Sequence, residues 1–187
     1  MLSPVSVRRG GVCLTLCCTL LVGATACNDD DADKDKDKAG SATATATSSA
    51  DRQKFAKTRF VANAGLAAGA TYQWIVKPFR AGKFKSGADG RKFALIKAGL
   101  AGAFTYNRLK AATKNAQGDP TLAKAVAPLS AGIEALKDLP SKLRKGDSTD
   151  SIVNSFDGII NDVKSAGKDA GAEVKDKVPS AGELAKN

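Results

Sequence analysis

A nine-residue motif occurs twice in this chain, and it limits the possible folds more than any other feature. The first copy covers 64–72 (AGLAAGATY) and the second covers 98–106 (AGLAGAFTY), at an offset of 34 residues. Both copies are rich in alanine and free of proline, a composition that favours helix. The sequence therefore predicts two similar helices in this part of the chain.

The positions of proline and glycine predict how these two helices are joined. We expect helices over 51–77 and 91–115 that form a hairpin. Pro78 ends the first helix, and the glycine-rich loop 82–90 reverses the chain. Two copies of a motif are too few for a solenoid, which needs at least about three repeats.

Small residues recur four positions apart in each predicted helix. Gly65 and Gly69 lie in the first helix, and Gly99 and Ala103 occupy the equivalent positions of the second. Residues four apart share one helix face, and small side chains let another backbone approach closely. We predict that these four residues are helix-packing positions.

The run 60–76 carries no charge, so a membrane-inserted hairpin is an alternative to a core helix. Its strongly apolar residues are few, however, and Asn63 and Gln73 interrupt it. A membrane span needs about 20 predominantly apolar residues. A central core helix is the favoured interpretation.

Apolar residues recur at helical spacing in the rest of the chain. Pro128 and Pro140 divide the pattern into short helices that begin at or near each proline. After Gly146 we expect one more amphipathic helix, and beyond Val163 the large apolar residues become sparse, which predicts a frayed C-terminus. The first stripe consists of Leu122, Val126, Leu129, Ile133, Leu136, Leu139 and Leu143.

No stretch alternates apolar and polar residues with period two over a convincing length. The predicted fold of 51–187 is therefore all-α, a four- to five-helix bundle. It is built on the Ala/Gly-rich, basic and aromatic hairpin of 51–115. The amphipathic helices of 116–187 complete it.

The first 26 residues have the composition of an export signal. Two arginines precede an uncharged, mostly apolar stretch over 12–26, which is too short for a comfortable membrane span. Three small residues then lead into Cys27. This ending resembles the lipobox of bacterial lipoproteins, and the resemblance implies that the signal peptide 1–26 is removed and that Cys27 is lipidated. An ordinary Ala-x-Ala cleavage site that happens to precede a cysteine is the alternative.

The composition changes abruptly after Cys27. Alternating Asp and Lys is followed by a low-complexity block of Thr, Ser and Ala that ends near residue 50. Neither stretch can bury enough apolar surface to offset the entropy of ordering it. We expect 27–50 to be a lipidated cysteine and a disordered tether, which would hold the domain on the order of 25–30 Å from the bilayer.

The positive charge of the chain is concentrated in one part. The formal net charge of the whole sequence is +10. Residues 51–115 carry 14 Lys and Arg against two Asp, whereas residues 116–187 carry 10 Lys and Arg against 11 acidic residues. The basic part also holds nine of the ten aromatic residues. Such asymmetry favours a surface that recognises an anionic partner.

Basic and aromatic residues are interleaved between positions 77 and 92. Each Lys or Arg near an anionic membrane contributes about 1 kcal/mol, and an inserted Phe adds an apolar anchor. In the alternative interpretation Phe79 and Phe84 close the end of the core, and the basic side chains are simply solvated. The candidates for binding an anionic surface are Lys77, Arg80, Lys83, Phe84, Lys85, Arg91 and Lys92.

The chain has no histidine, and three of its four cysteines lie within the predicted signal peptide. Histidine is the commonest general base and a common metal ligand, and one remaining cysteine cannot form a disulfide framework. We therefore expect no metal, no cofactor and no enzymatic activity.

These observations predict an exported lipoprotein on the extracytoplasmic face of the cell membrane, attached through Cys27. We expect its domain to be a non-catalytic binding module for an anionic lipid, an anionic wall polymer or an acidic protein partner. Nucleic acid is not expected, because the export signal directs the chain away from it. A structural or protective lipoprotein that pairs its helices with another protein is the second hypothesis, and an enzyme of unrecognised type is the third. The domain is similar to small helical secreted proteins of actinobacteria, a similarity that implies no particular activity.

Overall fold

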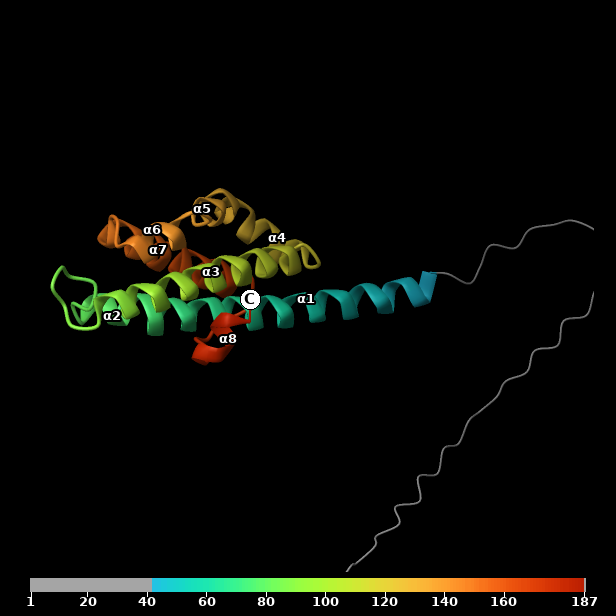
Figure 1. Ribbon diagram of the computed structural model, residues 1–187. Coiled ribbons are helices and arrows are strands. Elements are labelled where there is room, and N and C mark those ends of the chain that lie inside the picture. Colours follow the sequence, from blue (N-terminus) through green and yellow to red (C-terminus); the bar gives the residue numbers. More distant parts are fainter. Residues whose placement is uncertain (1–41, 187) are drawn as a thin grey trace, which may run out of the picture. The chain divides into compact units, whose positions relative to one another are not determined.

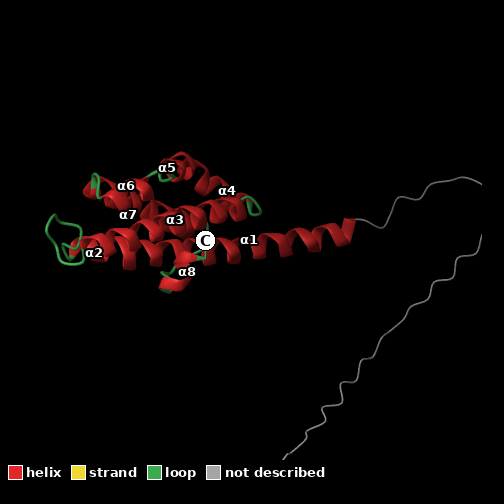
Figure 2. Cartoon of the chain, viewed as in Figure 1, coloured by secondary structure: helices red, strands yellow, loops and turns green. Residues whose placement is uncertain are grey.

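The computed structural model describes residues 42–186, and it describes their side chains from residue 51 onward. The predicted signal peptide, Cys27 and the tether up to residue 41 lie outside the described residues. Within the described part, every regular element is a helix (Figure 2). The predicted all-α bundle is confirmed.

Two long helices lie side by side and form the predicted hairpin (Figure 1). Helix α1 spans Ala42–Thr71 and continues through a π-helical segment, Tyr72–Val76, into the short helix α2, Lys77–Arg80. The chain reverses over 81–90, and α3, Arg91–Ala116, returns along α1.

Helix α1 begins earlier than predicted. It starts at Ala42, whereas we expected helix only from residue 51 and tether before it. The segment 42–50 contains only alanine, threonine and serine, with no proline or glycine to stop a helix. An adjoining stable helix can therefore extend into it without nucleating a new one.

The two copies of the repeated motif meet inside the hairpin. Thr71 and Thr105 are equivalent in the two copies, and their buried Oγ1 atoms lie 3.1 Å apart. The Thr105 hydroxyl donates to the Ala67 carbonyl at 3.4 Å, so it can accept from Thr71. Buried small side chains fill the rest of this interface: Ala64, Ala67, Ala68, Ala98 and Ala101.

The uncharged run 60–76 is a core helix, as predicted. Phe60 and Ile75, near its two ends, are both buried. None of the helices in the described part of the chain is long and apolar enough to cross a membrane.

Shorter helices cover the hairpin. A 3₁₀ turn that contains Pro128 separates α4 from α5, and Pro140 lies in the first turn of α6, as the two prolines predicted. Helix α6 packs on α3, and α7 packs on α1 and α4. These helices are α4 (Pro120–Val126), α5 (Ser130–Ala135), α6 (Leu139–Lys145) and α7 (Thr149–Asp169).

The C-terminal segment is packed on α1 rather than frayed. Residues 172–180 have no helical structure, and the Lys177 N–H donates to the Gly65 carbonyl at 2.8 Å. Val174 and Leu184 are buried in the same core as the long helices. The prediction of fraying is wrong. The segment has no helical stripe of apolar residues, but backbone contact with Gly65 and the buried side chains of Val174 and Leu184 hold it on the domain.

A short helix, α8, Ala181–Ala185, ends the described chain. Ser180 caps it: its side chain accepts from the Glu183 N–H, while the Glu183 carboxylate accepts from the Ser180 N–H at 2.7 Å. This reciprocal pair satisfies two backbone donors at the helix start. The same hydrogen bonds lower the pKa of the Glu183 carboxyl.

Candidate functional site

The predicted glycine positions of α1 are packing positions, and the chain itself occupies them. A Cβ atom on Gly65 or Gly69 would lie closer than 3.0 Å to backbone atoms of the C-terminal segment around Lys177. Only glycine lets the two backbones approach this closely. The face that these two glycines form is therefore filled from within the molecule.

The prediction for α3 is correct for Gly99 and wrong for Ala103. Gly99 faces Arg144 and Pro140 of α6, and Ala103 is exposed. Gly102 is the second packing position instead, because its α-carbon faces Phe156 and Pro140. The prediction took Ala103 because it lies four residues after Gly99. Helix α6 instead packs on Gly102, three residues after Gly99.

The predicted binding region, 77–92, lies where the hairpin turns. We call this region, extended along α3 to residue 97, the basic end. Pro78 has no N–H to donate to the Trp74 carbonyl four residues earlier, so the α-helical pattern cannot continue there. The chain adopts a π-helical segment instead, in which the Lys77 N–H donates to the Tyr72 carbonyl. Single π-helical turns are frequent at functional sites.

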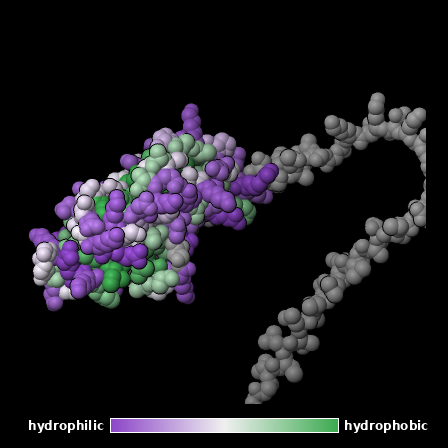
Figure 3. All heavy atoms as spheres, turned by 45° about the horizontal axis from the view of Figure 1, so that its top comes forward, coloured by the Kyte–Doolittle hydropathy of each residue, from purple (hydrophilic) through white to green (hydrophobic). Residues whose placement is uncertain are grey.

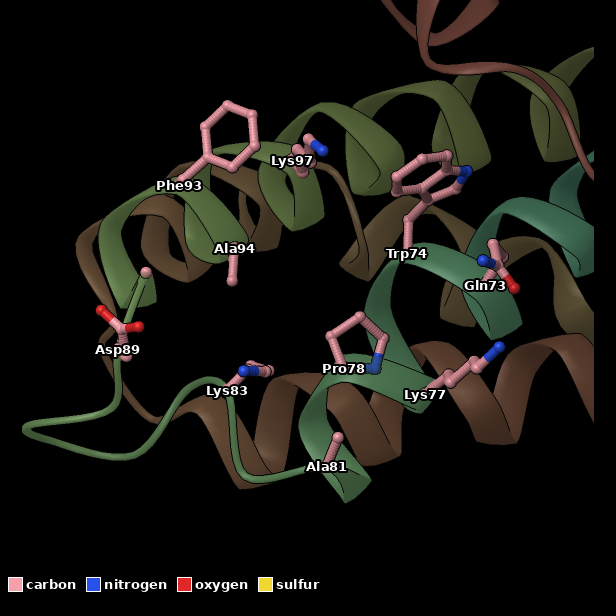
Figure 4. A pocket seen from close by; sticks show the side chains of 11 residues that line it. Gln73, Trp74, Lys77, Pro78, Ala81, Lys83, Asp89, Phe93, Ala94 and Lys97 are labelled. Carbon is pink, nitrogen blue, oxygen red and sulfur yellow. The ribbon is translucent and has the colours of Figure 1, made fainter.

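A groove runs between this π-helical turn and the start of α3 (Figure 4). It has a volume of about 430 Å³, which lies in the range of small-molecule sites. We call it the aromatic groove. Its apolar walls are Trp74, Pro78, Ala81, Phe93 and Ala94, and its polar lining is Gln73, Lys77, Lys83, Asp89 and Lys97.

Lys97 lies between the two aromatic residues of this groove. Its Nζ is 4.1 Å from the Phe93 ring centroid and 5.4 Å from that of Trp74. Both distances fall within the range of cation–π attraction. The Trp74 indole N–H donates to the Pro179 carbonyl at 3.3 Å, which joins the groove to the C-terminal segment.

A second hollow lies at the same end of the domain. We call it the basic pocket, and its volume is about 520 Å³. Arg80, Lys85 and Arg91 line it together with Asp150 from the first turn of α7. Its remaining lining consists of Phe79, Phe84, Ser86 and Thr149.

Phe84 is not an exposed anchor, contrary to its proposed role in surface binding. It is only 3% exposed, and its ring lies 6.2 Å from that of the half-buried Phe79. The Arg91 Nε–H donates to the Phe84 carbonyl at 2.9 Å and fixes the loop over this pair. The alternative interpretation, in which both rings close the end of the core, is the one that the structure supports.

The structure separates the predicted basic residues into two groups. Lys77 and Lys83 line the aromatic groove, whereas Arg80, Lys85 and Arg91 line the basic pocket. Lys92 is exposed and lines neither. All of them except the half-buried Arg91 are exposed.

An exposed apolar strip follows on α3, and we had not predicted it. Phe93, Ile96 and Leu100 are 62%, 48% and 36% exposed, and their spacing puts them on one helix face. Figure 3 shows apolar surface among charged side chains toward this end of the domain. Trp74 lies before the predicted region 77–92, and Phe93, Ile96, Lys97 and Leu100 lie after it, so none of them was predicted.

A polar cluster joins α3 to α5 away from the basic end. The Glu134 carboxylate accepts from the Tyr106 hydroxyl at 2.9 Å and from the Lys110 ammonium. These hydrogen bonds lower the pKa of Glu134, and the same bonds raise the pKa of Lys110 and of Tyr106. The cluster is exposed, and it ties two helices together.

No family model, no curated protein and no solved structure matches the chain.

Proposed function

We propose that this chain is an exported lipoprotein whose helical domain is a non-catalytic module that binds an anionic membrane surface through its basic end. Under this proposal the lipid on Cys27 tethers the protein, and the basic end attaches the domain itself. The observation that carries the proposal is the exposed apolar strip of α3 beside uncompensated basic side chains.

The cations of the basic end support electrostatic attraction, because none of the ion pairs in the described part of the chain involves them. Residues 77–97 contain seven Lys and Arg and a single acidic residue, Asp89. The ion pairs found in the described part of the chain all lie elsewhere. Since these cations are not neutralised within the domain, they can attract an anionic surface at about 1 kcal/mol each.

Helix α3 supplies the apolar contacts that this proposal requires. Phe93, Ile96 and Leu100 expose large side chains that the bundle does not cover. Apolar residues flanked by lysines are typical of helices that lie in a membrane interface. An acidic polymer would engage the cations alone, so the strip favours a bilayer over a soluble polyanion.

A tether makes weak binding sufficient. A lipid on Cys27 would confine the domain near the bilayer, which raises its effective concentration there. The second hypothesis, helix pairing with another protein through the small-residue faces, has less support because the C-terminal segment and α6 already cover those faces.

The test measures binding of the unlipidated chain, from residue 27 with Cys27→Ser, to vesicles. The vesicles contain phosphatidylcholine with a graded fraction of phosphatidylglycerol, at low and high salt. One variant replaces Arg80, Lys85 and Lys92 by Gln, and none of these residues lines the aromatic groove. The control replaces three exposed lysines elsewhere, Lys124, Lys137 and Lys142, and therefore has the same net charge.

We expect binding that rises with phosphatidylglycerol and falls with salt. The loss of three cations should weaken it by about 3 kcal/mol, or roughly 100-fold, and the control should weaken it far less. Ile96→Ser with Leu100→Ser should also weaken it, whereas Phe55→Ser, on the part of α1 beside the end of α3, should not. Equal losses in the two triple variants, or binding to dextran sulfate but not to vesicles, would contradict the proposal.

A further inference from the structure

The aromatic groove has properties that membrane attachment does not require. It is a defined hollow beside the π-helical turn, whereas electrostatic attachment needs only exposed charge. We infer that the aromatic groove binds a single acyl chain that ends in a carboxylate. This inference does not depend on the proposed function.

The shape of the groove favours a narrow, elongated ligand. One wall runs from Gln73 to Ala81, and the other runs from Gly90, just before α3, to Lys97. At a rise of 1.5 Å per residue, the α-helical part of the second wall, from Arg91 to Lys97, is about 9 Å long. Figure 4 shows the two helices as facing walls, with the loop that carries Lys83 and Asp89 at one end. A folded partner could not enter a volume of about 430 Å³.

The lining favours an apolar body. Trp74 and Phe93 present aromatic rings, and Pro78 and Ala94 face each other across the groove (Figure 4). Phe93 is 62% exposed, so a ligand that covers it removes apolar surface from water. A chain of methylene groups fits this lining without leaving a polar group unpaired.

The charges favour an anionic head. Lys77, Lys83 and Lys97 surround the groove, and Asp89 is the only acidic residue in its lining. Lys97 rests on two rings rather than on a carboxylate, so its ammonium is available for an ion pair. We assign the carboxylate of the ligand to Lys97, because its ammonium lies against the Trp74 and Phe93 rings that form the apolar walls.

The chain offers a direct reporter, since Trp74 is its single tryptophan. The experiment titrates the unlipidated chain with decanoate below its micellar concentration and follows Trp74 emission, with calorimetry as a second readout. The probes 1-decanol and decyltrimethylammonium have the same chain length with a neutral and a cationic head. Decyl phosphate has the same chain length with a different anionic head, so comparing its affinity with that of decanoate shows whether the site prefers a carboxylate.

We expect saturable binding of decanoate that is at least tenfold tighter than binding of either decanol or the cationic probe. Lys97→Gln should lower the affinity for decanoate about tenfold, because hydrogen bonds to charged groups are stronger than those to neutral groups. The affinity for decanol should not change. Lys97→Arg should restore most of the affinity, and Lys124→Gln on α4 should change nothing. Calorimetry of Phe93→Ala should show weaker binding of both ligands.

An emission change that does not saturate would overturn the inference. So would equal affinity for decanol and decanoate, or full affinity for decanoate in Lys97→Gln with unaltered helicity. Tighter binding of decyl phosphate than of decanoate would also overturn it, because the groove would then prefer a phosphate headgroup to a carboxylate. Vesicle binding by Arg80, Lys85 and Lys92 is tested with other variants and another probe, so the two proposals can fail separately.

Discussion

Individual glycines in this domain differ in what surrounds their α-carbons. Gly69 in α1 lies against the backbone of the C-terminal segment, and Gly158 in α7 has no heavy atom within 4 Å of the position its Cβ would take. The same substitution should therefore have opposite effects at the two sites. Gly69→Ala should destabilise the fold by about 1–3 kcal/mol because a backbone must move. Gly158→Ala should stabilise it by about 0.5–1 kcal/mol because alanine favours helix.

Urea denaturation of the two variants tests this difference. Both positions are helical and both changes add one methyl group, so the gain in helix propensity should be similar in the two variants. A difference in their stability therefore measures the packing around Gly69. Equal stabilisation of both variants would show that the C-terminal segment does not occupy the glycine face.

Glu134 should make stability depend on pH in one direction. Its pKa is lowered in the folded chain by hydrogen bonds from Lys110 and Tyr106. Its contribution is therefore present above the ordinary value of 4.5 and is lost as the pH falls through the folded value. The loss of stability on acidification should be smaller in Glu134→Gln than in the parent chain.

Tyr106 gives an independent readout of the same cluster. The bond to Glu134 raises its pKa, so Glu134→Gln should bring that pKa down toward its ordinary value of 10.0. Ultraviolet titration in a Tyr72→Phe background isolates Tyr106, since the chain has two tyrosines. An unchanged Tyr106 titration would contradict the geometry of the cluster.

At the scale of elements, the C-terminal segment behaves as part of the core. Leu184 on α8 is 4% exposed, whereas Val178 is 55% exposed. Leu184→Ala should cost about 2 kcal/mol or more, as buried leucines do, and Val178→Ala should change stability by less than about 0.5 kcal/mol. A neutral Leu184→Ala, measured by thermal or urea unfolding, would restore the prediction of a frayed end.

The elements that the sequence predicted are those with local causes. Alanine-rich composition predicted the two long helices, Pro78 and the glycine-rich loop 82–90 predicted the turn between them, and Pro128 and Pro140 predicted the breaks between the shorter helices. The C-terminal segment could not be predicted in this way, because the contact between Lys177 and Gly65 joins residues far apart in sequence. The exposure of Phe93 and the burial of Phe84 likewise depend on how the loop folds over the core, which spacing alone does not specify.

At the scale of the whole molecule, charge and exposed apolar surface coincide. The basic part of the sequence becomes the hairpin (Figure 1). Cations lie in and beside its turn, and the exposed strip of α3 begins just after that turn. Phe55 lies along α1 about 33 Å from Lys77 at 1.5 Å per residue. The two regions are far enough apart for a short-range probe to distinguish them.

The most direct test of the central claim asks which end of the hairpin meets the membrane. The unlipidated chain is mixed with phosphatidylglycerol vesicles that carry a nitroxide at the headgroup, and tryptophan quenching is measured. Trp74 reports the basic end, and Phe55→Trp in a Trp74→Phe background reports the other end. The account predicts strong quenching of Trp74 and weak quenching at residue 55. Equal quenching at both positions, or stronger quenching at residue 55, would contradict it.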